Sequence, residues 1–497
     1  MAEPGGGGAG PVPEHAGIVI IGSGFAGLGM AIRLKDAGYH DFVVLEKAGR
    51  LGGTWRDNSY PGCSCDVPSY LYSFSFALHP GWTQVFSPQR EIWDYLEWCA
   101  DRYGVRRHIR FGREVAELEY DDARRRWRVV LAGGQVVTAN AVVAGFGALH
   151  VPSYPDIPGR ERFTGPAFHS ARWDHSQDLT GKRVAVIGTG ASAIQFIPEI
   201  AARAGRLTVF QRTAPWVQPR PDRATSPRLR RLLRTVPLAN RALRIAIYWG
   251  LELRGLGFTV HPRLMRRQAE TALRYLERQV PDPRLRARLT PGYGIGCKRI
   301  LLSSVYYPAL QRDNVELVTD RVTEIRERSI LDAGGREHEV DVIVYGTGFK
   351  VTESLAELRI TGRGGRKIQD AWRDRVEAYL GTTVAGFPNL FFLSGPNTGL
   401  GHTSVVFMME AQTHYILECL RLLSRTGARA LDVRPGAQRE FNRRLRRRLD
   451  RRVWSTGGCR SWYLDGKGGN PTIWPGTTAE FWARTRRVRR RAYELIR

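Results

Sequence analysis

Two separate parts of the chain show a short apolar run, a glycine-rich turn and then apolar residues at helical spacing. In the first part, an apolar run at 18–21 leads into Gly22, Gly24 and Gly27, and a second apolar run follows at 42–45. Short apolar runs bounded by glycine are typical of buried parallel strands, and helical spacing between two of them indicates a crossover helix. The pattern therefore predicts a strand–helix–strand unit near the start of the chain.

This first unit has the features of a dinucleotide site. Its glycines form G-x-G-x-x-G, which lets backbone amides approach a pyrophosphate at a helix N-terminus. Glu46 directly follows the second run, where a carboxylate can bind ribose hydroxyls. An ordinary tight turn is the alternative, but strand, turn, helix, strand and acid all follow in the expected order.

A second unit of the same kind lies near the middle of the chain. Its apolar runs are at 184–187 and 207–210, and its turn reads G-x-G-x-x-A at Gly188, Gly190 and Ala193. The repeat predicts a second nucleotide-binding unit.

The two units differ in the charge that follows their second strand. Arg212 occupies the place in the second unit that Glu46 occupies in the first, and Thr213 follows it. A carboxylate would repel a 2′-phosphate, whereas a guanidinium pairs with it. We therefore expect FAD in the first unit and NADPH, in preference to NADH, in the second. A surface arginine without a ligand is the alternative.

Two further apolar runs end in glycine, at 140–149 and 340–349. Each fits a point where the chain leaves one nucleotide-binding domain and later returns to it. The predicted fold is α/β, with two Rossmann-like dinucleotide-binding domains, a discontinuous FAD domain with the NADPH domain inserted, and a helical insertion. The expected boundaries are a disordered tail at 1–14, FAD-binding parts at 15–155 and 351–497 (the latter with the C-terminal segment), NADPH-binding parts at 160–215 and 295–350, and the helical insertion at 216–294.

The insertion is helical in its periodicity and rich in arginine. Its stripe of Ile245, Ala246, Tyr248 and Leu251 is interpreted as core in preference to a membrane anchor. A basic surface that attracts anionic nucleotides or anionic lipid remains open, so weak peripheral contact with a membrane is kept as a secondary property.

Composition and charge narrow the class of protein. The chain has 497 residues, is 42% hydrophobic, and carries a formal net charge of +27, with arginines concentrated in 223–268 and 442–452. Such a length fits about two or three globular domains. No motif of a nucleic-acid reader accompanies the charge, so we expect no nucleic-acid partner. No apolar run approaches the roughly eighteen residues of a spanning helix, and the first residues lack the features of a signal peptide.

Cysteine usage suggests a reducing compartment. The chain has six cysteines, too few for a disulfide scaffold at this size, and Cys63 and Cys65 are too close for a C-x-x-C pair. We expect a reduced, cytoplasmic protein and predict no metal site.

Two longer motifs point to a family. Phe163, Gly165, His169, Trp173 and Asp174 match F-x-G-x-x-x-H-x-x-x-W-[P/D], just ahead of the second glycine turn. G-x-W-x-x-x-x-Y-P-G-x-x-x-D is matched by Gly53, Trp55, Tyr60, Pro61, Gly62 and Asp66. With these motifs the chain resembles the class B flavoprotein monooxygenases, and specifically the Baeyer–Villiger monooxygenases, over nearly its whole length.

The resemblance implies an NADPH- and FAD-dependent monooxygenase. Such an enzyme inserts one oxygen atom of O2 next to a carbonyl through a peroxide on the flavin C4a carbon, so that a ketone becomes an ester or a lactone. The implied partners are a ketone or related carbonyl compound and O2. N- or S-oxygenation, as in related flavin monooxygenases, and an uncoupled NADPH oxidase remain the alternatives.

The same resemblance assigns roles to charged residues. Arg299 matches the family's active-site arginine, which must hold a negatively charged oxygen, and Asp66 would orient it. Lys298, just before Arg299, would bind the NADPH 2′-phosphate together with Arg212. His169 would couple cofactor binding to domain rotation, and a satisfied core histidine is the alternative. This chain has "ILLSS" where better-known members tend to have proline soon after the arginine.

Further cofactor contacts are expected at three places. Gly53, Thr54 and Trp55 are expected at the flavin, although Trp55 could equally be core. Asn397 lies in a glycine loop ahead of a helix that begins near Ser404 and faces the flavin's pyrimidine edge. Trp462, in "CRSWYLDGKGGN", partly matches the family segment that folds over the nicotinamide.

Overall fold

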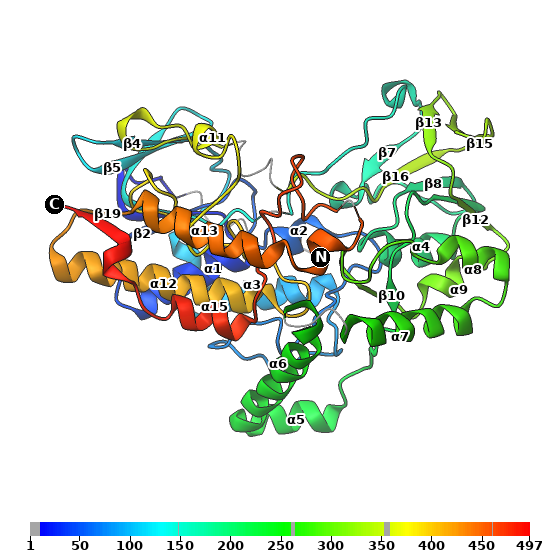
Figure 1. Ribbon diagram of the computed structural model, residues 1–497, viewed down its shortest axis with the longest axis horizontal. Coiled ribbons are helices and arrows are strands. Elements are labelled where there is room, and N and C mark those ends of the chain that lie inside the picture. Colours follow the sequence, from blue (N-terminus) through cyan, green and yellow to red (C-terminus); the bar gives the residue numbers. More distant parts are fainter. Residues whose placement is uncertain (1–9, 148, 260–263, 352–357, 460) are drawn as a thin grey trace.

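Figure 1 shows the computed structural model, which describes residues 10–147, 149–259, 264–351, 358–459 and 461–497. Two α/β bodies lie side by side, and each is built around its own sheet (Figure 1). Of the predicted tail, residues 1–9 lie outside the described residues, while Val12 is buried in an apolar cluster with strands of the first sheet.

The first sheet has eight strands in the order β17-β4-β5-β6-β1-β2-β3, with β18 also paired to β6. The predicted run at 42–45 is a strand, and the run at 18–21 is the end of one. The strands are β1 His15–Ile21, β2 Phe42–Leu45, β3 Ile109–Arg110, β4 Val115–Asp121, β5 Arg126–Leu131, β6 Val136–Ala144, β17 Arg359–Thr361 and β18 Leu390–Phe392. Because β17 and β18 come from the last third of the chain, this body is discontinuous in sequence, as predicted.

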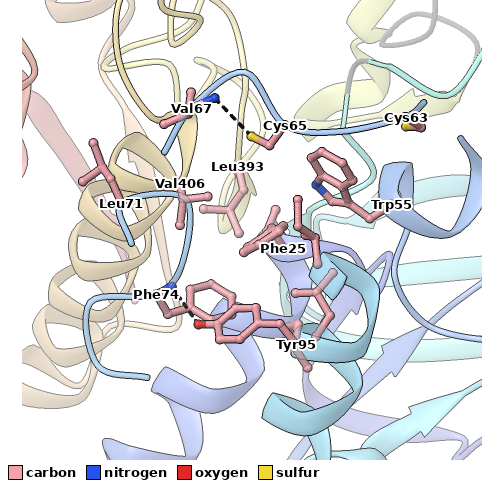
Figure 2. Packing of buried hydrophobic residues seen from close by; sticks show 14 of the residues in the cluster. Phe25, Trp55, Cys63, Cys65, Val67, Leu71, Phe74, Tyr95, Leu393 and Val406 are labelled. Carbon is pink, nitrogen blue, oxygen red and sulfur yellow. Dashed lines mark hydrogen bonds between the residues drawn. The ribbon is translucent and has the colours of Figure 1, made fainter. Parts of the chain in front are cut away.

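This body also contains eight of the described helices. They are α1 Phe25–Asp36, α2 Thr54–Asp57, α3 Gln89–Arg102, α11 Ile368–Ala371, α12 Val405–Thr426, α13 Pro435–Leu449, α14 Val453–Thr456 and α15 Thr478–Thr485. Figure 2 shows how α1, α3 and α12 share one core, in which Phe25 lies 5.2 Å from Phe74, beside Tyr95, Leu393 and Val406. Burial of these large apolar side chains stabilises the body by about 1.5–3 kcal/mol each.

The second sheet has five parallel strands in the order β12-β9-β8-β16-β7. They are β7 Ala167–His169, β8 Arg183–Ile187, β9 Arg206–Phe210, β12 Val315–Val318 and β16 Val342–Tyr345. Helices α4 Ala193–Ala201 and α9 Tyr306–Ala309 pack beside it, and a small antiparallel sheet comprises β13 Val322–Ile325, β14 Ser329–Asp332 and β15 Glu337–Glu339. The predicted fold class, two Rossmann-like units with the second inserted into the first, is confirmed.

Shorter elements complete the chain. They are β10 Val217–Gln218 paired with β11 Leu301–Leu302, β19 Ala430–Val433 paired with β20 Tyr493–Ile496, and the 3-10 turns η1 Arg106–His108, η2 Arg160–Arg162, η3 Ser170–Arg172, η4 Arg363–Gly365 and η5 Arg490–Ala492.

The predicted helical insertion contains α5 Pro227–Thr235, α6 Pro237–Thr259, α7 Leu264–Gln279 and α8 Pro283–Leu289. In Figure 1, α5 and α6 project below the two bodies. Because only one face of α6 is covered, Ile245 and Ala246 are exposed, while Tyr248 and Leu251 are half-buried. The prediction that this stripe is core is therefore wrong for Ile245 and Ala246. None of the described helices has the length and apolarity needed to cross a bilayer.

Candidate functional site

A cavity of about 1690 Å³ lies between the two sheets and is lined by both glycine turns. Most of the sequence-predicted site residues line it: Gly22, Gly24, Glu46, Gly53, Thr54, Trp55, Asp66, Gly188, Gly190, Arg212, Thr213, Lys298, Arg299 and Trp462. Gly27, Ala193, His169 and Asn397 do not.

Gly27 serves the packing of the first unit. A Cβ atom at Gly27 would lie 1.9 Å from the carbonyl oxygen of Gly22, so any side chain there would separate α1 from β1. Gly22 itself has φ +92°, a backbone conformation that favours glycine. The G-x-G-x-x-G spacing thus brings the N-terminus of α1 to the cavity wall.

Glu46 is held rigidly at the end of β2. Its side chain is buried (4% exposed) and accepts hydrogen bonds from the Ser23 backbone N–H at 2.9 Å and the Ser23 hydroxyl at 2.7 Å. Arg56 donates to it at 3.1 Å. This carboxylate therefore lies in a fixed position at the cavity wall, at the end of the second strand of the first unit. Sequence reasoning missed Ser23 and Arg56, although Ser23 lies within the glycine turn.

Two cations without carboxylate partners lie at the second glycine turn. In the described part of the chain, neither Arg212 nor Lys298 forms an ion pair with an acidic side chain. The Lys298 ammonium lies 4.9 Å from the ring centroid of Tyr293, and burial, together with the charge of Arg212, lowers the pKa of Lys298. The two positive charges disfavour each other, so a phosphate dianion between them would relieve that repulsion.

Arg299 and Asp66 form a bidentate ion pair at the cavity. Arg299 donates from Nε and Nη2 to the two carboxylate oxygens at 2.6 and 2.7 Å. Burial opposes ionisation of Asp66, but the guanidinium beside it lowers the pKa of that carboxyl below its usual range. The charge of Asp66 in turn raises the pKa of Arg299. The Arg299 side chain keeps 30% of its exposure, so its permanent charge is available to a group in the cavity.

The loop that carries Asp66 is fixed by two residues that sequence reasoning missed. Arg220 donates to the Ser64 hydroxyl at 2.7 Å and to the Phe86 carbonyl at 3.1 Å. Gln195, on α4, accepts from the Tyr60 hydroxyl at 2.9 Å and donates to the Ser64 carbonyl at 3.0 Å. These contacts join segments more than a hundred residues apart, so no local spacing could have shown them.

His169 lies at the end of β7, outside the cavity. Its side chain is fully buried, and Nδ1 accepts from the Ala171 backbone N–H at 3.1 Å. Its ring lies 5.5 Å from that of Tyr154 and 5.7 Å from that of Phe349, both in segments that connect the two sheets. Burial lowers the pKa of His169 to about 4. The imidazole is therefore neutral and touches the connections between the bodies, not the reacting centre.

Of the two cofactor contacts predicted in the C-terminal part, Trp462 lines the cavity and Asn397 does not. The side-chain amide of Asn397 donates to the carbonyls of Asn470 at 2.7 Å and Ile473 at 3.1 Å. It ties the glycine loop to the C-terminal segment. Trp462 lines the cavity with 44% of its surface exposed, so it can contact a ligand.

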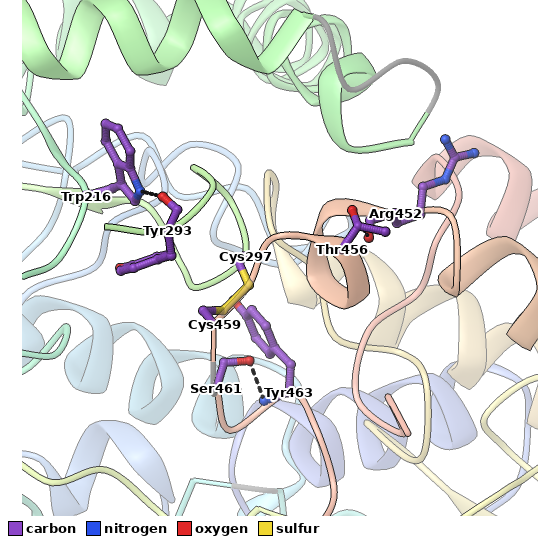
Figure 3. Close-up of a disulfide and its surroundings, with 8 residues drawn as sticks. All are labelled: Trp216, Tyr293, Cys297, Arg452, Thr456, Cys459, Ser461 and Tyr463. Atoms are coloured by element: carbon purple, nitrogen blue, oxygen red, sulfur yellow. Dashed lines mark hydrogen bonds between the residues drawn. A yellow bond between two sulfur atoms is a disulfide. The ribbon is translucent and has the colours of Figure 1, made fainter. Parts of the chain in front are cut away.

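Cys297 and Cys459 form a disulfide, shown in Figure 3. The expectation of a fully reduced chain is wrong for this pair, because the fold brings together two cysteines 162 residues apart. The bond joins the segment of Lys298 to the segment of Trp462. The other four cysteines are free and buried.

Comparisons with known proteins agree with this geometry. A model of the pyridine nucleotide-disulphide oxidoreductase family matches residues 19–248. A Baeyer-Villiger monooxygenase of Streptomyces coelicolor is 52% identical over 98% of this chain and 94% of its own length. A Baeyer-Villiger monooxygenase of Pseudomonas aeruginosa is 49% identical over 97% of this chain and 92% of its own length.

Solved structures give the same result. Oxidised steroid monooxygenase bound to NADP superposes with a TM-score of 0.87 at 31% identity, covering 97% of this chain and 99% of that one. Cyclohexanone monooxygenase from Rhodococcus sp. Phi1 bound to NADP+ also superposes with a TM-score of 0.87, at 28% identity. The match covers 98% of this chain and 100% of that one. By its sequence, its fold and the arrangement of its cavity, the chain belongs to the Baeyer–Villiger monooxygenase family.

Proposed function

We propose that this protein is an NADPH- and FAD-dependent monooxygenase that inserts one oxygen atom of O2 next to the carbonyl of a ketone. The observation that carries the proposal is the Arg299–Asp66 pair, which presents a fixed positive charge to a cavity bounded by two dinucleotide turns. The family relatives support the same reaction class.

The residues present fit both cofactors. The cradle of the first glycine turn and the buried carboxylate of Glu46 would hold FAD by its pyrophosphate and ribose. Arg212, Lys298 and Thr213 would hold the 2′-phosphate of NADPH. Bound FAD supplies hydride acceptance from NADPH and the activation of O2.

The chain's own residues then act on the substrate. Arg299 would stabilise the negative charge that develops on the carbonyl oxygen of the ketone during attack, because its guanidinium cannot lose its proton at working pH. Asp66 keeps the guanidinium in one orientation. Trp55, which is buried and donates from its ring to the Tyr72 hydroxyl at 3.1 Å, would help to exclude water at that end of the cavity.

The proposal also includes the domain boundaries, with FAD-binding parts at 15–155 and 351–497 and NADPH-binding parts at 160–215 and 295–350. It includes a positioning role for His169 and a cytoplasmic location of the protein. Weak peripheral contact with a membrane is also a proposal, and the exposed face of α6 is the part of the chain that supports it.

The test is a panel of linear, cyclic and aromatic ketones and of sulfides, assayed with the purified yellow protein and NADPH. We expect esters or lactones in amounts that match the NADPH consumed. Sulfoxides with no ester would instead indicate heteroatom oxygenation. Hydrogen peroxide released in proportion to NADPH, with no acceleration by ketones, would indicate an uncoupled oxidase.

A further inference from the structure

Exposed apolar side chains are concentrated on the helical insertion. In the described part of the chain, nine of the fourteen exposed large apolar side chains lie between 229 and 273. They are Leu229, Leu232, Val236, Leu238, Ile245, Trp249, Leu253, Leu264 and Leu273. Scattered exposed apolar residues are ordinary, but a concentration on one projecting element marks an interaction surface.

The outer face of α6 carries four large apolar side chains. Leu238, Ile245, Trp249 and Leu253 are 71%, 56%, 52% and 63% exposed, and the last three repeat every four residues, which places them on one side of the helix. We call these four residues the outer stripe. Their exposure is higher than that of any other large apolar side chain described apart from Val305.

The helix cannot turn this stripe inward, because two buried charged side chains of α6 hold it in its present orientation. Arg244 donates to the carbonyls of Tyr70, Leu71 and Ser73 at 3.0–3.1 Å. Glu252 accepts from the Thr478 backbone N–H at 3.2 Å. Rotation would leave both charges unpaired, which is strongly disfavoured in a buried setting. The exposure of the outer stripe is therefore a fixed feature of the fold.

The surroundings of the stripe are positive. The exposed arginines of α5 are Arg228, Arg231 and Arg234, and α5 has no acidic residue. Arg241 and Arg254 are exposed on α6, whose single acidic residue, Glu252, is buried. Among the described residues, none of these five arginines forms an ion pair with a carboxylate.

We propose that the outer stripe and the α5 arginines dock on an anionic lipid bilayer. An amphipathic helix with an apolar face, a tryptophan and flanking arginines lies in the plane of the membrane interface, held by apolar burial and by attraction to anionic headgroups. A second copy of the chain fits this surface less well, because a symmetric contact would bring the same unpaired arginines together.

The position of α6 also suggests which ketones are used, a step that rests on the proposed function. The inner face of α6 packs on the loop around His402: a Cβ at Gly255 would meet the His402 ring at 2.2 Å, and Glu252 lies 3.3 Å from its Nε2. Leu400 and Thr403 of that loop line the cavity. Because one helix separates the docking surface from the cavity wall, the substrates favoured are lipophilic ketones that partition into the membrane.

The binding test uses the flavin-loaded full chain and sedimentation with vesicles. The vesicles are of phosphatidylcholine alone or of equal parts phosphatidylcholine and phosphatidylglycerol. We expect binding to the anionic vesicles that weakens with added salt. Combined Ile245→Ser, Trp249→Ser and Leu253→Ser should reduce binding by about tenfold or more, and so should combined Arg228→Glu, Arg231→Glu and Arg234→Glu. Trp482→Ser, which removes a 44% exposed tryptophan on α15, is the matched control and should bind normally.

Three results would overturn the proposed docking on an anionic bilayer. It is overturned if the wild-type protein does not sediment with anionic vesicles at low salt, or if the Trp482 control loses as much binding as the stripe variant. It is also overturned if light scattering shows a dimer that the stripe variant dissociates while vesicles bind neither protein. NADPH turnover of a small water-soluble ketone should be unchanged in the stripe variant. Because sedimentation does not depend on turnover, loss of the proposed reaction would leave the docking result intact.

Substrate delivery has its own readout. Anionic vesicles should lower the apparent KM of the wild-type protein for a long-chain ketone severalfold and leave that for a small water-soluble ketone unchanged. The stripe variant should not show this effect. An equal effect in both proteins would overturn the link between docking and substrate class.

Discussion

At the scale of single residues, Arg299 combines two properties that usually conflict. It is fixed by two hydrogen bonds to Asp66, yet its side chain remains partly exposed and lines the cavity. A free arginine would lose side-chain entropy on meeting a negatively charged oxygen, whereas this one is already ordered. That ordering is what an electrostatic catalyst needs.

We predict that Arg299→Ala leaves reduction of the flavin by NADPH measurable and lowers ester formation by about 10²–10³-fold. Reduction is followed by absorbance and the ester by gas chromatography. Arg183→Ala is the control. Arg183 forms an ion pair with Asp341, with 2.7 Å between the charged atoms, and neither residue lines the cavity. Esterification at the wild-type rate would remove Arg299 from the mechanism.

A second prediction concerns cofactor choice. Arg212→Ala should raise the KM for NADPH by about 10–100-fold and change that for NADH little, because only NADPH carries the 2′-phosphate. Initial rates at varied cofactor give both constants. Arg206→Ala, at an exposed arginine paired with Glu316, should change neither. Equal effects on both cofactors would contradict the phosphate assignment.

His169 gives a prediction about pH. Its pKa, about 4 in the folded protein, lies below the ordinary value of 6.5. The unfolded chain therefore binds more protons between these values, and the stabilisation is complete above about pH 6.5 and is lost as the pH falls toward 4. Between pH 7.5 and pH 5, wild type should lose about 2 kcal/mol more unfolding free energy than His169→Asn in urea titrations. Parallel losses in both proteins would mean that His169 does not titrate in this way.

At the scale of elements, the cavity depends on short segments held from outside it. The backbone N–H of Leu301, in β11, donates to the carbonyl of Trp216 at 2.9 Å, and the pairing of β10 with β11 fixes the strand that follows Arg299. On the other side of Lys298, the disulfide joins Cys297 to Cys459 and so to the segment of Trp462. Strand pairing and a covalent bond thus hold a loop that carries two cavity cations.

We predict that combined Cys297→Ser and Cys459→Ser lowers stability by about 2–5 kcal/mol, because the bond closes a long loop. It should also raise the KM for NADPH, since Trp462 would lose its tether to the loop of Lys298. Thermal midpoints and initial rates measure the two effects. Dithiothreitol should bring wild type to the level of the variant and leave the variant unchanged, since the cysteines that remain are free. If dithiothreitol also changed the thermal midpoint or the KM of the variant, its effect on wild type could not be assigned to the Cys297–Cys459 bond.

At the scale of the whole molecule, polar side chains of one body hold segments of the other. Gln195 belongs to the second body and holds Tyr60 and Ser64 of the first. We predict that Gln195→Ala leaves FAD bound but raises the share of NADPH that ends as hydrogen peroxide severalfold, because the loop of Asp66 is loosened. A peroxide assay beside NADPH consumption tests this. Gln135→Ala, on an exposed turn of the first sheet, should stay coupled, and a tightly coupled Gln195 variant would contradict the prediction.

Local patterns predicted much of this architecture. The runs at 42–45 and 184–187 lie within parallel strands, and the helix expected near Ser404 begins at Val405. Such predictions succeed because strand and crossover helix are set by residues close in sequence. The family resemblance, drawn from two family motifs together with the two glycine turns, is confirmed by relatives that match over nearly the full length.

The predictions that were wrong concern residues whose surroundings are decided by tertiary contacts. Ile245 was placed in the core because an apolar stripe on a helix is normally buried, yet α6 is held in its present orientation by the buried Arg244. The disulfide was missed because the proximity of Cys297 and Cys459 exists only after folding. Asn397 was expected at the flavin, but its amide is used to tie two loops together.

Contiguous residues are enough to predict the two nucleotide-binding units, the contrast of Glu46 with Arg212, and the family, because the spacing within each motif has a direct chemical meaning. Contacts between segments far apart in the chain, by contrast, join Cys297 to Cys459, let Gln195 span the two bodies, and leave the apolar stripe of α6 facing outward. Those outcomes depend on which surfaces the chain brings together across long separations, and hydrophobic burial and polar pairing are settled jointly over the whole fold.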